Sequence, residues 1–135
     1  MTTMPSLVID TSAFVTIFKR EPLREQMEEL LGRAERVIVP ATCLVELALL
    51  RRIAEDMFAW AENLVRRAGY ELAPLSLPES LVAVDAARRY GKGSGHSAGL
   101  NYGDCLVYAV AKYRDLPLLF AGDDFRHTDI IPALT

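Results

Sequence analysis

Long apolar runs and a leader-like start are both missing from this sequence of 135 residues. No stretch holds the roughly 20 consecutive apolar residues that a membrane-spanning helix needs. The N-terminus also lacks a basic segment followed by an apolar stretch and a small-residue cleavage site, the pattern typical of a secretory signal peptide. We therefore expect a cytoplasmic protein rather than a membrane or secreted one.

Cysteine and histidine are scarce, with two of each. Cys43 and Cys105 are far apart in the sequence and lie in apolar, helix-like contexts, so they form no pair with metal-ligand spacing. His96 and His127 stand alone in expected loops. This scarcity argues against a disulfide framework and against a zinc site.

A strong positive charge is also absent, because 15 Lys and Arg stand against 18 Asp and Glu, for a net charge of −3. Proteins that bind nucleic acid through backbone attraction alone are usually basic. A nucleic-acid partner would therefore need a local basic patch or bound metal ions. The glycine-rich stretch 91–99 is no P-loop, since it has neither the spacing nor the Lys-Ser/Thr ending. We find no strand-elbow serine and no reactive cysteine context.

The sequence does contain short apolar runs that alternate with amphipathic segments from end to end. The apolar runs predict strands at 7–9, 37–39, 71–74, 118–120 and 129–131, and the helical spacing predicts helices at 12–18, 23–34, 43–53 with Thr42 as cap, 55–68, 78–90 and 105–113. This alternation indicates an α/β protein with a mainly parallel sheet covered by helices on both faces. The length suits one domain over 1–135.

Aspartates stand where ligands gather in such a sheet. Asp10 directly follows the first strand, and ligands bind outside the carboxyl ends of parallel strands. Asp123 and Asp124 follow another strand at the same kind of position. Each of them also has a simpler explanation, because aspartate caps helices and favours turns.

Two further acids lie on expected helices. Apolar residues surround Glu46, and burying its carboxylate is costly unless the group is paired or binds a metal; the alternative is a helix edge that reaches solvent. Asp104 heads an apolar helix face, although an acid there also suits an N-terminal cap. Together these acids predict an oxygen-only site for Mg²⁺ or Mn²⁺. Carboxylate-bound divalent ions of this kind catalyse phosphodiester hydrolysis.

Several segments resemble the PIN-domain family, and more specifically the VapC toxins of bacterial type II toxin–antitoxin pairs. The segments are Val8–Ala13, the helical Glu46, Leu100–Cys105, and Phe120–Phe125 with Thr128–Ile130. The resemblance covers nearly the whole chain. It implies a three-layer α/β/α sandwich and a Mg²⁺- or Mn²⁺-dependent endoribonuclease that acts as a toxin by cleaving RNA. It also implies a small antitoxin partner and a homodimer.

Carried over residue by residue, Asp10, Glu46 and Asp104 match three of the family's catalytic, metal-binding acids. The fourth acid falls in the turn at 123–124, where we favour Asp124 and keep Asp123 as the alternative.

Contacts to the substrate are less specific. A hydroxyl of Thr11 or Ser12 is expected to contact a water at the metal. Lys92 and His96 are candidates for binding RNA, because their loop leads into Asp104. A further set of basic residues could line an RNA groove, although a solvated helix face is the simpler explanation for any single one. These are Arg51, Arg52, Arg88, Arg89 and Arg126.

Two other functions remain open on the residues alone. A non-catalytic interaction module with the same fold would use the acids as caps and as an anchor for a basic partner. A phosphoryl-handling enzyme or receiver domain would use Asp10 as a nucleophile. Ser12 disfavours a haloacid-type phosphatase, which needs a second aspartate there, and Thr11 disfavours a receiver, which has an acidic pair at the end of its first strand.

Overall fold

The structure is a computed structural model that describes residues 5–50 and 55–134. Four parallel strands form the centre of the molecule. The strands lie in the order β3-β2-β1-β4, and every neighbouring pair is parallel. Their bounds are β1 Leu7–Ile9, β2 Val37–Pro40, β3 Tyr70–Ala73 and β4 Leu118–Leu119. The predicted parallel sheet is thus confirmed.

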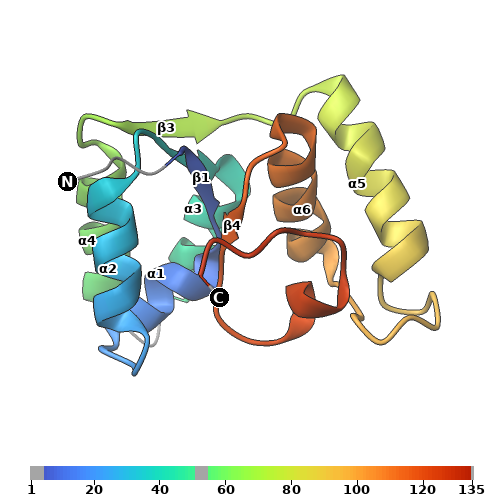
Figure 1. Cartoon of the computed structure of the whole chain (residues 1–135), viewed down its shortest axis with the longest axis horizontal. Helices are drawn as coiled ribbons and strands as arrows, with labels where there is room; N and C mark the ends of the chain where they lie inside the picture. Colours follow the sequence, from blue (N-terminus) through green and yellow to red (C-terminus); the bar gives the residue numbers. More distant parts are fainter. Residues whose placement is uncertain (1–4, 51–54, 135) are drawn as a thin grey trace.

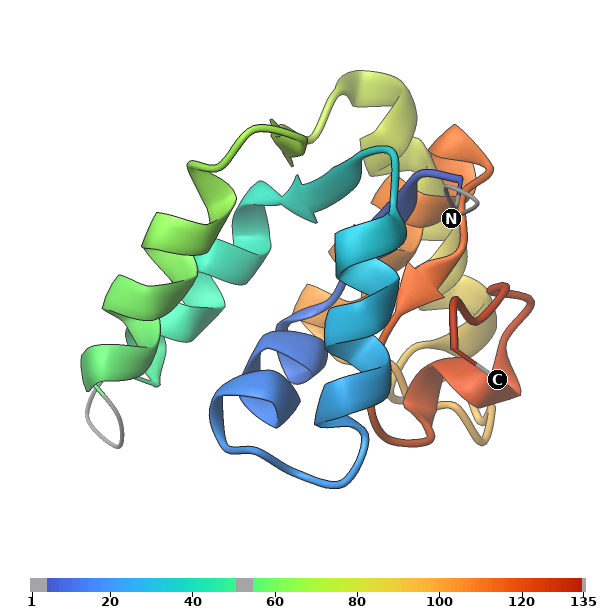
Figure 2. The same ribbon diagram turned by 60° about the vertical axis from the view of Figure 1, so that its left-hand side comes forward.

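Two helices follow each of the first three strands. They are α1 Thr11–Phe18 and α2 Arg24–Arg33, α3 Ala41–Leu49 and α4 Glu55–Val65, and α5 Leu77–Tyr90 and α6 Tyr102–Arg114. The chain steps from β1 to β2 to β3 in one direction, and the α5–α6 connection then returns past both central strands to β4. Right-handed crossovers place that connection on the face opposite α1 and α2. Figures 1 and 2 show the central strands between α2 and α6, which confirms the sandwich.

The direction of the connections reverses between β1 and β4. Val8 and Ile9 of β1 pair with Leu118 and Leu119 of β4. Just beyond this pairing, the backbone N–H of Asp10 donates to the carbonyl of Leu119 at 2.9 Å. A reversal of this kind leaves a crevice at the carboxyl edge of a parallel sheet, where ligands commonly bind. The segments after β1 and after β4 therefore meet at the edge where a site is expected.

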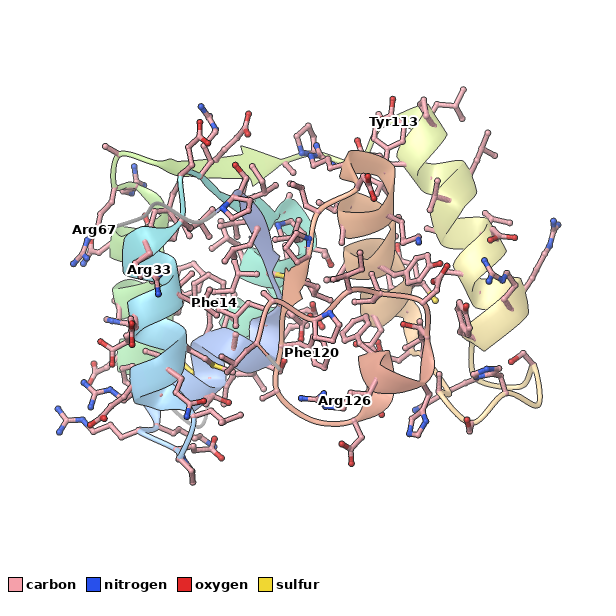
Figure 3. The ribbon with its side chains drawn as sticks, in the orientation of Figure 1. Phe14, Arg33, Arg67, Tyr113, Phe120 and Arg126 are labelled. Atoms are coloured by element: carbon pink, nitrogen blue, oxygen red, sulfur yellow. The ribbon has the colours of Figure 1, made fainter. Side chains whose placement is uncertain are left out.

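The core explains why the strands are short, uninterrupted apolar runs. Every residue of β1, β2 and β4 is buried, because helices cover both faces of the sheet. Phe14 of α1, Leu47 of α3 and Tyr108 of α6 are buried against it, and Figure 3 shows Phe14 and Phe120 near the centre of the molecule. None of the helices in the described ranges is long and apolar enough to cross a membrane.

Two helices begin two or three residues earlier than predicted. Helix α3 begins at Ala41 with Pro40 as N-cap, so Thr42 is not its cap. Proline has no N–H to continue the strand pairing, and its fixed φ suits the entry to a helix. Helix α6 begins at Tyr102 rather than Cys105, because the Asn101 side chain caps it. The predicted end of the third helix at Ile53 lies outside the described residues, which place the C-cap at Leu50.

The C-terminal region also differs from the prediction. The 3₁₀ helix η1, Asp124–His127, begins within the expected turn. The predicted strand 129–131 is wrong, since only Pro132 forms an isolated parallel bridge, to Leu118. The side chain of Asp129 instead accepts a hydrogen bond from Tyr108 and pairs with Lys112. These contacts hold Asp129 against α6, and the chain meets β4 only after that residue, where the Leu118 N–H donates to the Ile131 carbonyl at 2.9 Å and the Ala133 N–H donates to the Leu118 carbonyl at 2.8 Å.

Candidate active site

Asp10 is both a helix cap and a buried acid at the sheet edge. It directly follows β1, is 6% exposed, and is the N-cap of α1. One carboxylate oxygen, Oδ2, accepts hydrogen bonds from the backbone N–H of Ser12 at 3.1 Å and from the Ser12 hydroxyl. The capping role and the site role suggested by the sequence are therefore compatible, because one oxygen makes both capping contacts.

Glu46 reaches the same edge from α3. Thr11 donates its hydroxyl to Glu46 Oε1 at 3.0 Å, and the side chain is half-buried. The apolar surroundings expected for Glu46 are only partly a core, because Val45 and Leu49 of this helix are exposed. Gly103 lies against the other side of the carboxylate, since a Cβ placed there would be 2.7 Å from Glu46 Oε2. Glu46 thus lies between α1 and the first turn of α6.

Asp104 stands in that first turn. Its backbone N–H donates to Asn101 Oδ1 at 2.8 Å, and its Oδ2 accepts from the backbone N–H of Asn101 at 3.1 Å. This reciprocal pair is a capping box, which satisfies two N–H groups that the helix leaves unpaired. As at Asp10, a single carboxylate oxygen makes the capping contact.

Burial and mutual repulsion disfavour the charged forms of these three acids. Burial raises the pKa of Asp10 and Glu46, hydrogen bonds from Ser12 and Thr11 respectively oppose the rise, and a neighbouring carboxylate adds to it in each case. Burial also raises the pKa of Asp104 to about 6, with opposition from the Asn101 N–H and contributions from Asp10 and Asp124. The acids therefore lie close enough for the charge of one carboxylate to raise the pKa of its neighbour.

The turn after β4 supplies the fourth acid. Asp124 opens η1 and raises the pKa of Asp104, so its charge acts directly on the group. Asp123 precedes η1 as its N-cap, and both side chains are exposed. Of the two alternatives left open by the sequence, Asp124 is the one whose charge acts on Asp104, and its place as the fourth acid stays a prediction.

The donor set fits a hard divalent cation. The four acids offer only oxygen atoms, the ligands preferred by Mg²⁺ and Mn²⁺. Crowded carboxylates with raised pKa values are the environment that a cation would stabilise. Within residues 5–50 and 55–134, no three Asp, Glu, His or Cys side chains lie close enough to hold one ion without moving. Binding a cation therefore requires these side chains to move, and Asp10 and Asp104 each have a second carboxylate oxygen that makes no capping bond.

Both predicted hydroxyls are already engaged with carboxylates. Thr11 donates to Glu46, while Ser12 donates to Asp10 and accepts from the backbone N–H of Ala121 at 3.0 Å. The structure thus assigns them to orienting acids, where the sequence suggested contact with a water. The Ala121 N–H and Gly103 were missed by sequence reasoning. A glycine in the first turn of a helix, directly before an acid, was the available signal for Gly103.

The two residues of the glycine-rich loop differ in their surroundings. Lys92 lies near Asp104, because its charge lowers the pKa of that carboxyl group. His96 packs edge-on against Tyr90 with ring centroids 4.9 Å apart, and its Nδ1 accepts from the Ala98 N–H. The fold therefore gives Lys92 a place at the acids and His96 a contact within the loop, and RNA binding by either stays a prediction.

Two of the other basic residues that the structure describes have partners of their own. Arg89 pairs with Asp85 and Asp129. The Arg126 guanidinium lies over the Phe120 ring at 5.5 Å, and Figure 3 labels both residues. Arg88 is exposed on α5. Arg51 and Arg52 lie outside the described residues.

Comparison with known proteins identifies the family of this chain. The PIN-domain family model matches residues 7–131. Ribonuclease VapC42 of Mycobacterium tuberculosis is 39% identical over 131 residues, which cover 96% of this chain and all of the relative. The crystal structure of Mycobacterium tuberculosis VapC20, described as a Sarcin-Ricin loop cleaving toxin, superimposes with a TM-score of 0.75 at 13% identity, covering 96% and 99% of the two chains.

A toxin–antitoxin complex from Klebsiella pneumoniae gives a TM-score of 0.66 at 15% identity, covering 88% of this chain and 89% of that one. The two solved structures share the fold, and the sequence match extends over almost the entire length of both VapC42 and this chain. The chain therefore belongs to the PIN-domain family, and within it to the VapC ribonucleases.

Proposed function

We propose that this protein is an RNA-cleaving toxin that hydrolyses phosphodiester bonds with the help of Mg²⁺ or Mn²⁺. One observation carries the proposal: the Glu46 carboxylate lies between Thr11, the residue after Asp10, and Gly103, the residue before Asp104, so acids from three separate segments meet at one edge of the sheet. Such crowding is costly in the absence of a cation. The VapC ribonuclease relatives support RNA as the substrate, and we place the protein in the cytoplasm, where RNA is available.

The metal would be held by Asp10, Glu46, Asp104 and Asp124. When bound, a divalent cation neutralises charge on the scissile phosphate and lowers the pKa of an attacking water. Two hydroxyl side chains of this protein would keep the metal-binding carboxylates in place. Ser12 and Thr11 orient the carboxylates of Asp10 and Glu46 by donating hydrogen bonds to them.

Lys92 would supply the positive charge that the overall composition lacks. It stands close enough to Asp104 to lower the pKa of that carboxyl group. An ammonium group beside an acid cluster can bind a phosphate oxygen of the RNA backbone while the acids hold the cation. We propose Lys92 as a substrate contact, with His96 as a second candidate from the same loop.

Cleavage of a labelled single-stranded RNA tests the proposal. The wild type should cleave with Mg²⁺ or Mn²⁺ and stop when EDTA is added, whereas Asp10→Asn should be inactive under all conditions. Asp56→Asn, which removes an exposed acid on α4, is the matched control and should cleave like the wild type. Equal behaviour of wild type and Asp10→Asn would contradict the proposal. RNA binding without any cleavage by the wild type would favour a non-catalytic interaction module.

We also propose a small antitoxin as partner, supported by the fold shared with a protein solved as a toxin–antitoxin complex. Expression of the wild type alone should then arrest bacterial growth, and Asp10→Asn should not. Co-expression of the product of the adjacent small gene should relieve the arrest. If Asp10→Asn arrests growth as strongly as the wild type, toxicity does not depend on the acid site.

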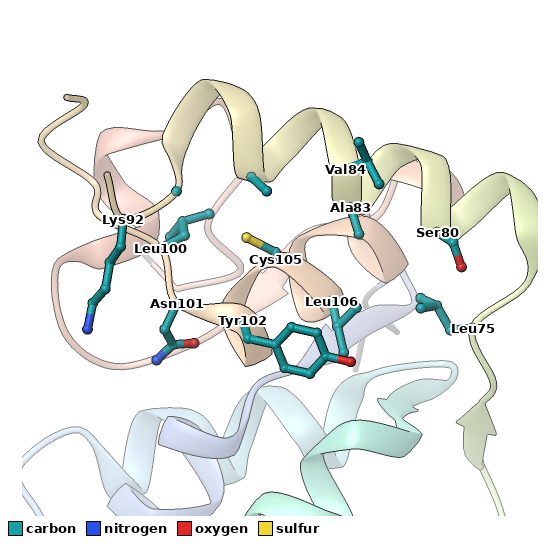
Figure 4. A pocket seen from close by; sticks show the side chains of 12 residues that line it. Leu75, Ser80, Ala83, Val84, Lys92, Leu100, Asn101, Tyr102, Cys105 and Leu106 are labelled. Carbon is teal, nitrogen blue, oxygen red and sulfur yellow. The ribbon is translucent and has the colours of Figure 1, made fainter. Parts of the chain in front are cut away.

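A second copy of this chain is the proposed occupant of the apolar surface on α5 and the start of α6. Val84 of α5 and Tyr102 of α6, which are 43% and 81% exposed, line a groove of about 510 Å³ between the two helices (Figure 4). Leu77 and Leu81 add further exposed apolar surface on α5, at 73% and 61% exposure. Apolar surface of this extent is typical of interfaces that are covered in solution.

Sedimentation equilibrium tests this interface. The wild type should behave as a dimer, and Leu81→Glu should shift it toward the monomer. Ile131→Glu places the same change at an exposed apolar residue in the C-terminal segment and should leave the dimer intact. A monomeric wild type would overturn the dimer.

A further inference from the structure

The first turn of α6 contains a glycine whose backbone does not require one. Gly103 is the second residue of the helix, directly before Asp104, and it is not among the glycines with positive φ. A glycine within a helix is less favourable than alanine, because it loses more conformational freedom on folding. Its presence here therefore needs another explanation.

Close approach of another side chain supplies that explanation. A Cβ at position 103 would lie 2.7 Å from Oε2, 3.0 Å from Cδ and 3.3 Å from Oε1 of Glu46. All three atoms belong to one carboxylate, which occupies the space that a side chain at 103 would fill. From the other direction, Thr11 donates its hydroxyl to Oε1 of the same group at 3.0 Å.

The two contacts define where the carboxylate lies. Thr11 belongs to α1 and holds the group by a hydrogen bond, while the bare backbone of Gly103 lets it reach the first turn of α6. Asp104 is the next residue in that turn, and its charge acts on Glu46. A methyl group at 103 would push the carboxylate away from this place.

We propose that Gly103 is a positioning residue for the metal site, and that its lack of a side chain sets the distance between the carboxylates of Glu46 and Asp104. This inference rests on the proposed function, in which both acids hold the cation. It predicts that an added methyl group damages cation binding through Glu46 while the fold survives. The carboxylate is the far end of a flexible side chain, so it can move without displacing backbone.

Gly32 offers a matched control. It lies inside α2, is exposed, lacks a positive φ, and a Cβ placed there would meet nothing within 4 Å. Gly32→Ala and Gly103→Ala therefore make the same change in a helix. Only the second places a methyl group against a carboxylate.

Mn²⁺ titration of the whole protein without RNA, followed by electron paramagnetic resonance, measures the effect directly. Gly103→Ala should bind Mn²⁺ about 10- to 100-fold more weakly, the usual loss when support of a metal ligand is removed. Gly32→Ala should bind like the wild type. Both variants should keep the far-UV circular dichroism and melt no earlier than the wild type, because alanine favours a helix over glycine.

A shortened acid provides the rescue. Glu46→Asp withdraws the carboxylate by one methylene and should weaken Mn²⁺ binding in the wild-type background. In the Gly103→Ala background, Glu46→Asp should weaken Mn²⁺ binding by a smaller factor or partly restore it, because the shorter side chain leaves room for the methyl group. Purely additive losses would contradict the inference, as would unaltered Mn²⁺ binding or unfolding of Gly103→Ala.

Glu46→Gln separates this inference from the proposed function. If Glu46→Gln weakens Mn²⁺ binding and Gly103→Ala does not, only the role of Gly103 is overturned. If neither change affects Mn²⁺ binding, the assignment of Glu46 to the metal site fails, and the inference fails with it.

Discussion

The Ser12 hydroxyl accepts a hydrogen bond from the backbone N–H of Ala121 at 3.0 Å, across 109 positions of sequence. The same hydroxyl donates to the carboxylate of Asp10. The hydroxyl therefore connects the residues after β1 to the segment after β4. It also fixes the orientation of the buried Asp10 carboxylate at the carboxyl edge of the sheet. This bridge joins the two loops that carry Asp10 and Asp124.

Replacing Ser12 tests the bridge. Ser12→Ala removes both hydrogen bonds and should lower the free energy of unfolding by about 1 kcal/mol, with a larger relative loss of RNA cleavage because Asp10 is no longer oriented. Urea unfolding and a cleavage assay measure the two effects. Ser12→Thr keeps the hydroxyl and should retain most of the activity. Full activity of Ser12→Ala would show that Asp10 needs no such support.

Stability without metal should depend on pH through Asp104. Its pKa is raised from 3.8 to about 6, mainly by burial, so the fold favours the protonated form. A raised carboxyl pKa contributes stability below about pH 4 that is lost as the pH rises through about 6. Asp104→Asn should therefore gain stability relative to the wild type between pH 4.5 and 7.5, by about 1 kcal/mol because the group is partly exposed.

Urea unfolding in EDTA at the two pH values measures this difference. A constant difference between Asp104→Asn and the wild type would contradict it. For the same reason Mn²⁺ should bind the wild type more tightly as the pH rises through 6, because the cation competes with the proton for the carboxylate.

The two aspartates of the turn should differ sharply in their importance. The charge of Asp124 acts on Asp104. Asp124→Asn should therefore reduce RNA cleavage by at least about 10- to 100-fold, the usual loss when the support of a metal ligand is removed. Asp123→Asn is the adjacent control and should stay close to the wild type. Single-turnover cleavage with Mn²⁺ compares them. The reverse order of effects would make Asp123 the fourth acid.

The contact between Tyr108 and Asp129 should hold the C-terminal segment in place. The Tyr108 hydroxyl donates to Asp129 Oδ1 at 2.6 Å. Burial alone would raise the pKa of Asp129, but hydrogen bonds from Tyr108 and Lys112 outweigh it and lower the pKa. Tyr108→Phe should cost about 1.5 kcal/mol of unfolding free energy.

A lowered carboxyl pKa contributes stability above about pH 4 that is lost as the pH falls, so the cost of Tyr108→Phe should shrink in acid. Urea unfolding at pH 7 and pH 3.5 measures it. Tyr113→Phe removes an exposed hydroxyl from the same helix and serves as control (Figure 3). An equal cost for both variants at pH 7 would exclude a special role for the Asp129 contact.

Much of the fold could be predicted because its signals are local. The apolar runs at 7–9 and 37–39 are buried on both faces, and β-branched residues in such runs favour strands between helices. The main error arose from contacts between segments that are separate in the sequence. The strand expected at 129–131 failed because its aspartate binds side chains of α6, a contact that no pattern within the segment reveals.

From the sequence alone one can read the available chemistry: a parallel α/β fold with aspartates after its strands, oxygen ligands without histidine or cysteine partners, and the motifs of the PIN family. How these parts meet becomes visible in the folded chain. In the folded chain Thr11 and Ser12 donate hydrogen bonds to Glu46 and Asp10, and the Glu46 carboxylate lies against Gly103. The physical reason is that these relationships are distances between segments far apart in the chain, and such distances exist only once the helices pack around the sheet.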